Sequence, residues 1–136
     1  AMNDAIKATP GPIGYAAING PIQPGLNPVS VRNAAGEFVR PSFASVAAAA
    51  LAQLSKMKGD FRVSLTNGPG ADSYPITSFT WLYVPETAAD PVRGKAVADY
   101  LQWVYDRGQQ IAQEKGYSVL PPAVLAKARQ RAATIH

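Results

Sequence analysis

Apolar residues recur with two different periods along the chain, and the period distinguishes predicted helices from predicted strands. Between Ser42 and Met57 they are spaced three or four residues apart, which predicts a helix that Ser42 caps. The same spacing predicts a long helix over residues 91–115, and a last helix is predicted over residues 123–133. The two longer stripes consist of Val46, Ala49, Ala50, Leu54 and Met57, and of Val92, Ala96, Val97, Tyr100, Leu101, Val104 and Ile111.

Prolines and glycines mark where these helices start, weaken and stop. Gly59 follows two lysines and predicts the end of the first helix. Pro91 suits the first turn of the long helix, and Gly116 closes it. Gly108 is a weak point inside the long helix, because glycine is a poor helix former.

Strands are predicted where β-branched and aromatic residues lie between turn formers. A hairpin is expected around residues 33–36, with Gly36 available for a positive φ. In the strand over residues 13–18, Gly14 predicts a close approach of another part of the chain. The predicted strands cover residues 13–18, 29–32, 37–40, 61–65 and 76–84. Strands interspersed with helices predict an α/β or α+β fold.

A segment rich in glycine and proline, residues 66–75, has two interpretations. Its glycines and hydroxyls resemble a phosphate-cradling loop, but it contains neither a Walker sequence nor a GxGxxG motif. Pro69 lacks an N–H donor, and the segment leads into a β-type run instead of a helix. We therefore favour a structural turn, and we expect the same role for Asp60 and Asp72.

Three aromatic residues alternate along the predicted strand over residues 76–84. Phe79, Trp81 and Tyr83 share one face because side chains of a strand alternate between its two faces. Such a face is a possible stacking platform for single-stranded nucleic acid or a sugar. A core face covered by the following helix is the favoured interpretation.

Composition and charge remove several classes of function. The chain of 136 residues is long enough for one domain with its own core. Its net charge of +4 is small and its basic residues are scattered along the chain, which argues against a nucleic-acid partner. The basic residues near the C-terminus, Lys127, Arg129 and Arg131, are expected to be a solvated helix end.

Candidate catalytic and metal-binding residues are scarce. The chain has no cysteine, which excludes disulfides, zinc–thiolate sites and thiol catalysis. Its single histidine, His136, stands at the chain end and is expected to be a frayed surface residue. We therefore predict no enzyme, no catalytic residue, no metal site and no cofactor. The start of the chain has no basic-then-apolar leader, so no signal peptide is expected in it, and no apolar run is long enough for a membrane span.

Taken together, the motifs resemble the periplasmic phosphate-binding protein of the ABC phosphate transporter. The resemblance includes VRNAAGEFVRPS (residues 31–42) and GADSYPITSFTW (residues 70–81), and it follows the family order over nearly the whole chain. The other matching stretches are residues 9–15, 60–67, 94–96, 106–109, 116–117 and 120–121. The chain looks like the C-terminal portion of a member, well under half of its length.

The resemblance implies an α/β fold that is part of a type II periplasmic-binding-protein fold. Family members have two lobes that close on phosphate at a hinge. By this resemblance, residues 1–65 form the C-terminal part of lobe two, residues 66–84 cross the hinge, and residues 85–136 form the C-terminal helical part of lobe one.

The phosphate-binding motifs of the family are expected earlier in a full-length member. They include a Thr-Phe turn, a serine, an aspartate, and an arginine followed by a Ser-Gly-Thr helix start, and none of these occurs here. Ser78-Phe79-Thr80 lies in the predicted crossing strand and matches no ligand motif of the family. No ligand-binding residue is therefore carried over to this chain.

The sequence is consistent with two functions. The first is a truncated relative of the substrate-binding component of a phosphate transporter that lacks most phosphate ligands. By resemblance its partners are inorganic phosphate, weakly or not at all, and the membrane subunits of the ABC transporter, and its location is the periplasm. The alternative is a repurposed or decayed interaction module that self-associates without binding phosphate. Exposed sheet edges and helix faces predict a homo-oligomer in either case.

Overall fold

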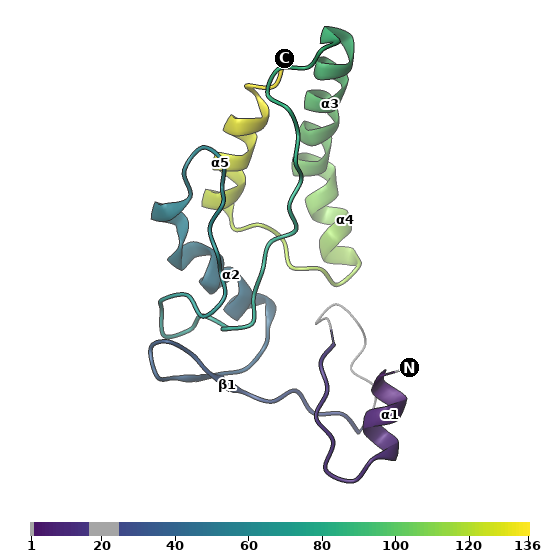
Figure 1. Ribbon diagram of the computed structural model, residues 1–136, viewed down its shortest axis with the longest axis vertical. Helices are drawn as coiled ribbons and strands as arrows, with labels where there is room; N and C mark the ends of the chain where they lie inside the picture. The colour runs from purple at the N-terminus through teal and green to yellow at the C-terminus, as the bar shows by residue number, and fades with distance from the viewer. Residues whose placement is uncertain (1, 17–24) are drawn as a thin grey trace.

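Helices make up most of the regular structure of the chain. A computed structural model describes residues 2–16 and 25–136. Figure 1 shows the course of the chain. The elements are α1 (Met2–Ala8), β1 (Val31–Arg32), β2 (Phe38–Val39), α2 (Phe43–Ala52), the 3₁₀ turn η1 (Leu54–Lys56), α3 (Pro91–Trp103), the π-helical turn η2 (Val104–Gly108), α4 (Gln109–Glu114) and α5 (Pro122–Ala132).

Helix α2 begins where the sequence predicts it and ends earlier. Ser42 caps it through a reciprocal pair of bonds: the Ser45 N–H donates to Ser42 Oγ at 3.0 Å, and the Ser42 N–H donates to Ser45 Oγ at 3.0 Å. The prediction of a single helix through Met57 is wrong beyond Ala52, because the chain tightens there into η1. The Met57 N–H bonds to the Leu54 carbonyl, three residues back, and the Met57 side chain enters the core with 2% of its surface exposed.

The long predicted helix is confirmed, with an interruption at its predicted weak point. The Asp90 carboxylate accepts the Val92 N–H at 2.9 Å, and Pro91 occupies the first turn. Five residues ending at Gly108 form the π-helical turn η2 between α3 and α4. Gly116 adopts a φ of +76° and ends the helix, as expected of a glycine just past a helix C-terminus.

The apolar stripe predicted on this helix lies mostly outside the core. Leu101 is buried, but Val92 is 79% exposed and Tyr100 is 60% exposed. The helix turns Gly94 and Leu101 inward instead. The spacing of apolar residues predicts that the segment is a helix, but the neighbouring elements decide which face of the helix is covered.

The predicted hairpin is confirmed. Val31 pairs with Val39 and Arg32 pairs with Phe38 in an antiparallel register. Gly36 adopts the predicted positive φ, at +90°.

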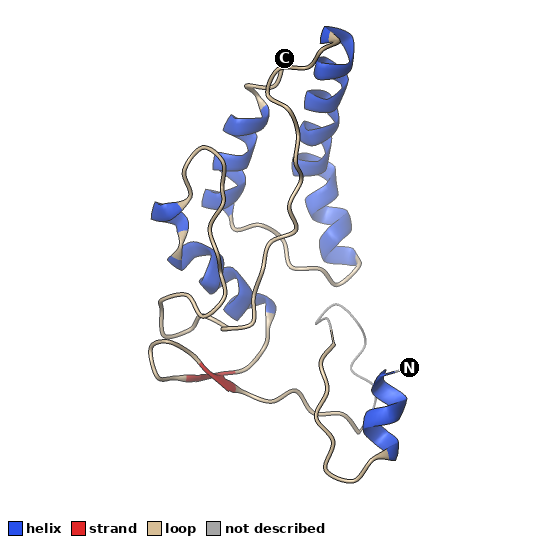
Figure 2. Cartoon of the chain, viewed as in Figure 1, coloured by secondary structure: helices blue, strands red, loops and turns tan. Residues whose placement is uncertain are grey.

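The other predicted strands form no sheet in the described part of the chain. Figure 2 shows the two short strands of the hairpin and long loops elsewhere. In the described part of the chain, residues 61–65 and 76–84 belong to no ladder, and neither do residues 13–16. The predicted strand over 13–18 lies partly outside the described residues, since its last two positions are not described. The predicted α/β fold is therefore confirmed only for the helices and for one hairpin. A helix forms its hydrogen bonds within itself, whereas a strand needs a neighbouring strand.

A small core joins the middle of the chain to helix α5, and we call the part of the molecule around this core the body. Ala50, Met57, Leu65 and Val124 are buried together, so residues 50–65 and helix α5 share one apolar cluster. Helix α5 contacts both α2 and α3. Helix α1 lies apart from this body, beside the loop that follows it (Figure 1). The close approach predicted at Gly14 is made there by a side chain and not by main chain, because a Cβ on Gly14 would overlap the end of the Ile6 side chain.

Candidate functional site

An open, largely apolar cleft runs along the inner side of the helices. Its volume is about 880 Å³. Residues 60–62 and 76–84 line it, and side chains of α3 and α5, among them Leu101 and Val124, form its floor. In Figure 1 the extended chain that contains residues 76–84 runs between α5 and the α3–α4 helix.

The segment of residues 77–84 has the side-chain alternation of a strand. Thr77 is 6% exposed and Phe79 packs against the core, whereas the alternate residues Ser78 and Thr80 are exposed. The Phe79 and Trp81 rings lie edge to face with centroids 5.5 Å apart, which confirms that these two aromatics share a face. Tyr83 is 85% exposed, so the predicted core face stops before it.

The main chain of this segment has no strand partner. Among the described residues, no N–H of residues 77–84 donates a hydrogen bond, and no carbonyl of the segment accepts one from another main-chain group. Its polar contacts there are local, such as the Thr77 hydroxyl on the Tyr74 carbonyl at 2.8 Å. The segment is thus held by its side chains and leaves its strand edges open.

The cations that line the cleft are paired with carboxylates. Arg62 Nε lies 2.7 Å from Oδ2 of Asp60, which is two residues earlier in the chain. Arg131 forms a two-point contact with Glu86 at 2.8 and 2.9 Å. The side-chain hydrogen bond from Arg131 lowers the pKa of Glu86, and the bond from Arg62 lowers the pKa of Asp60. Paired guanidinium groups are poor anion receptors, since a second anion must compete with the resident carboxylate.

Arg129 and Arg131 stand in the last turn of α5 with side chains 41% and 43% exposed, as the sequence predicts. The basic residues of α5 also make contacts that the sequence does not predict. Lys127 donates to the Met57 carbonyl at 3.1 Å, and Arg129 donates to the Tyr105 carbonyl at 3.0 Å and also pairs with Asp106. With Arg131 on Glu86, each of the three cations connects α5 to a different part of the chain. The sequence could not reveal these contacts, because their partners lie between 23 and 70 positions away.

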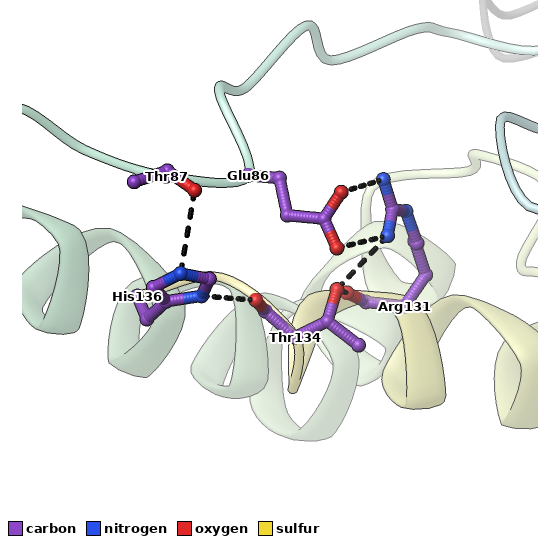
Figure 3. A network of polar contacts seen from close by, with 5 residues as sticks. All are labelled: Glu86, Thr87, Arg131, Thr134 and His136. Atoms are coloured by element: carbon purple, nitrogen blue, oxygen red, sulfur yellow. Dashed lines mark hydrogen bonds and ion pairs between the residues drawn. The ribbon is translucent and has the colours of Figure 1, made fainter.

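The C-terminus is fastened to residues 86–88, as Figure 3 shows. The Ala88 N–H donates to the His136 carbonyl at 2.7 Å, and the His136 N–H donates to the Glu86 carbonyl at 3.0 Å. The His136 ring contacts the Thr134 carbonyl at 2.9 Å and the Thr87 hydroxyl at 3.3 Å. His136 is a surface residue, as predicted, but these bonds hold it in place, so the expectation that it is frayed is wrong. We call this arrangement of residues 86–88 and 131–136 the C-terminal clasp.

The turn-rich segment of residues 66–75 is organised by a residue that the sequence analysis did not single out. Asn33 Nδ2 donates to the carbonyls of Gly70, Ala71 and Ser73 at 3.1, 2.7 and 3.1 Å. The Asn67 N–H bonds to the Pro75 carbonyl at 2.8 Å. The predicted turns are present, and the groups that the loop directs at Asn33 are carbonyls, which repel an anion. The signal available in the sequence was the asparagine that opens the hairpin turn.

The described residues contain no group of three or more His, Asp or Glu side chains that could hold a metal ion. None of the described helices has the length and apolar character needed to cross a membrane.

Comparison with known proteins finds relatives of one kind. The chain is 36% identical over 118 residues to the phosphate-binding protein PstS of Xylella fastidiosa, a match that covers 86% of this chain and 32% of the relative. It is 38% identical over 116 residues to the protein of the same name from Pasteurella multocida, covering 85% of this chain and 33% of the relative. The relative from Methanocaldococcus jannaschii is 31% identical over 131 residues, covering 88% of this chain and 33% of that protein.

These matches cover most of this chain but only part of each relative. The chain spans about a third of the length of the curated relatives it matches. Their names describe binding proteins, in agreement with the prediction that the chain is not an enzyme. No protein-family model matches the chain.

Proposed function

This chain is homologous to the phosphate-binding proteins PstS over about a third of their length, and we propose that it corresponds to the C-terminal third of such a receptor. The observation that carries the homology is the extent of the match, which takes in 85% of this chain and 33% of the Pasteurella multocida relative. The C-terminal placement rests on the order of the matching motifs in the family. The fold is then part of a type II periplasmic-binding-protein fold. Residues 1–65 belong to lobe two, residues 66–84 cross the hinge, and residues 85–136 belong to lobe one.

In this proposal the chain by itself does not bind phosphate with the affinity of a receptor. A dehydrated phosphate needs several donors, usually main-chain N–H groups and unpaired arginines. The two arginines that line the cleft are already paired with Glu86 and Asp60, which supports the proposal. The carbonyls of residues 70–73 point toward Asn33, and this also speaks against an anion site in that loop.

Titration calorimetry with inorganic phosphate tests the proposal. We expect no saturable heat for the purified chain at phosphate concentrations up to about 1 mM, where a receptor-like site would be full. The full-length Pasteurella multocida relative, measured in the same buffer, is the positive control. A micromolar dissociation constant for this chain alone would overturn the proposal.

The partners and the location follow from the same proposal. The complete receptor would deliver phosphate to the membrane subunits of an ABC transporter, in the periplasm. The division into lobes has a separate test in limited proteolysis of the full-length relative. We expect the first cut near the region equivalent to residues 66–84 if the hinge lies there, because exposed connections are cleaved before packed helices.

One feature favours the alternative, a module that self-associates without phosphate. The outer face of α3 carries Val92, Tyr100 and Trp103, which are 79%, 60% and 48% exposed. The Tyr100 and Trp103 rings stack on this face with centroids 6.1 Å apart. An apolar helix face of this kind is typical of a protein–protein contact.

A further inference from the structure

We propose that Asn67 is a site of spontaneous deamidation, at which the chain converts its own asparagine into aspartate and the β-linked isomer of aspartate. The reaction uses water and the main-chain nitrogen of the next residue, Gly68. It concerns the turn-rich segment of residues 66–75 and goes beyond the proposed function, because it depends neither on phosphate nor on a partner protein.

The chemistry joins two neighbouring residues. The Gly68 nitrogen loses its proton to hydroxide and attacks the side-chain carbonyl carbon of Asn67, which closes a five-membered ring. The bond from that carbon to the side-chain nitrogen breaks, and the nitrogen takes up protons from water and leaves as ammonia. A second water molecule opens the ring at either of its two carbonyls. One product is aspartate, and the other is a main chain that runs through the former side chain.

The local structure favours this reactive pair of residues. Asn67 has a φ of +47°, a region that asparagine and glycine tolerate best. Gly68 is buried, and a Cβ at this position would lie 3.1 Å from Gln53 Nε2 and 3.3 Å from the Leu65 carbonyl oxygen. Packing therefore opposes any side chain at position 68. The nitrogen that attacks Asn67 is thus left without the shielding that a side chain would give it.

The Asn67 side chain is available for the reaction. Asn67 is exposed, and its carboxamide makes no hydrogen bond to another described residue. The Gly68 N–H donates to the Leu65 carbonyl at 3.2 Å, the long end of the usual range for such bonds. Attack therefore requires a local opening of the turn that breaks this bond, and not unfolding of the chain.

Two other asparagines lack these conditions and serve as internal references. Asn33 is 6% exposed, and both ends of its amide are hydrogen-bonded. Asn27 precedes Pro28, whose nitrogen has no proton to lose. Neither residue is expected to react at the rate of Asn67.

The β-linked product should loosen the turn. It adds one carbon to the main chain between the N–H of residue 67 and the N–H of Gly68. These groups donate to the Pro75 carbonyl at 2.8 Å and to the Leu65 carbonyl at 3.2 Å. A longer chain between the two donors cannot keep both bonds in place, so the modified chain should unfold at a lower urea concentration than the original chain.

Peptide mapping by mass spectrometry after incubation of the folded chain at mildly alkaline pH tests the proposal. We expect the peptide that contains Asn67 to gain the mass difference between O and NH at least about tenfold faster than the peptide that contains Asn33, which must first break its contacts. Isoaspartyl methyltransferase should label the product. The sequence has a second Asn-Gly pair, Asn19-Gly20, in a different tryptic peptide, so the two pairs are measured separately.

The unfolded chain shows whether the fold permits the reaction. In urea both Asn-Gly pairs should react. An Asn67 that stays intact in the folded chain while it reacts in urea would overturn the proposal. Equal rates at Asn67 and Asn33 in the folded chain would overturn it as well.

A pair of matched substitutions tests the effect on the turn. Asn67→Gly tolerates the positive φ and has no amide to lose, so the label at position 67 should disappear and the urea midpoint should stay constant during incubation. Asn27→Gly is the control, because Asn27 is exposed and this variant keeps Asn67. Its urea midpoint should fall with time as in the original chain. A fall of the same size in Asn67→Gly would refute the loosening of the turn by the modified Asn67.

Discussion

Asn33 connects the hairpin to the turn-rich segment through one amide group. Its Oδ1 accepts the N–H groups of Ala35 and Glu37 at 3.0 Å each, while its Nδ2 donates to the carbonyls of Gly70, Ala71 and Ser73. Five contacts from a side chain that is 6% exposed exceed what most buried polar groups make. Asn33 therefore sets the position of residues 70–73 relative to β1 and β2.

The substitution Asn33→Ala should lower the free energy of unfolding by about 2–3 kcal/mol, because it leaves partly buried carbonyls and N–H groups unpaired. Urea denaturation followed by circular dichroism measures this. Asn27→Ala is the matched control. Asn27 is exposed, and its replacement should change the free energy by less than about 0.5 kcal/mol. Equal effects of the two substitutions would show that the Asn33 contacts contribute nothing.

At the scale of the elements, one continuous helix contains two glycines with opposite surroundings. Gly94 lies against the C-terminal clasp, where an added Cβ would be 2.8 Å from the main-chain carbon of His136. Gly108 lies in η2, where an added Cβ would be 3.4 Å from a Val104 methyl, an ordinary contact. The glycine at position 94 is required by packing, and the one at position 108 is not.

The same chemical change at these positions should have opposite effects. Gly108→Ala should raise the free energy of unfolding by about 0.5–1 kcal/mol, the difference in helix propensity. Gly94→Ala should lower it by about 1–3 kcal/mol, because main chain must move to make room. Thermal unfolding of both variants checks this. The packing explanation is wrong if both substitutions stabilise the chain.

The C-terminal clasp depends on an ion pair that responds to acid. Arg131 lowers the pKa of Glu86 below its ordinary value of 4.5. A carboxyl group with a lowered pKa stabilises the folded state above its ordinary pKa, and this stabilisation is lost as the pH falls through the lowered value. The clasp is therefore expected to hold at neutral pH and to loosen in acid, at a pH below 4.5.

The variant Glu86→Gln should melt at a lower temperature than the original chain at pH 7, and the difference should shrink as the pH is lowered below 4.5. Melting curves across this range provide the measurement. Asp72→Asn serves as the control, because Asp72 is exposed and forms no ion pair with any other described residue. A difference between Glu86→Gln and the original chain that stays constant with pH would exclude the ion pair as its cause.

At the scale of the whole molecule, apolar surface remains uncovered at two places. One is the cleft with its open strand edge, and the other is the outer face of α3 around Tyr100 and Trp103. Folded monomers rarely expose such surfaces together, because contact between copies removes them from water.

We therefore expect the apparent mass in light scattering to rise with protein concentration. Trp103→Gln should reduce this rise, since it removes the largest ring of the α3 face. Phe38→Gln is the control, because Phe38 is 71% exposed on the hairpin, away from that face. A compact monomer at high concentration would contradict the prediction of self-association.

The local elements could be predicted because their causes are local. Ser42 caps α2 through a residue three positions away, Pro91 and Gly116 delimit the long helix, and Gly36 permits the hairpin turn. The interruption at Gly108 also lies where helix propensity is lowest. Helix hydrogen bonds join residues four apart, so the sequence near each helix contains most of the information that determines it.

Tertiary structure decided the features whose partners lie far away in the chain. It selected which face of α3 is covered, assigned Arg131 to Glu86 and Lys127 to Met57, and made Asn33 the anchor of a loop. It also left residues 61–65 and 76–84 without a sheet, although their composition is typical of strands. Residues 61–65 even begin with a tight turn, since Phe61 has a φ of +56° and its carbonyl accepts the Val63 N–H. A sheet also needs a neighbouring strand, and the described chain provides none for either segment.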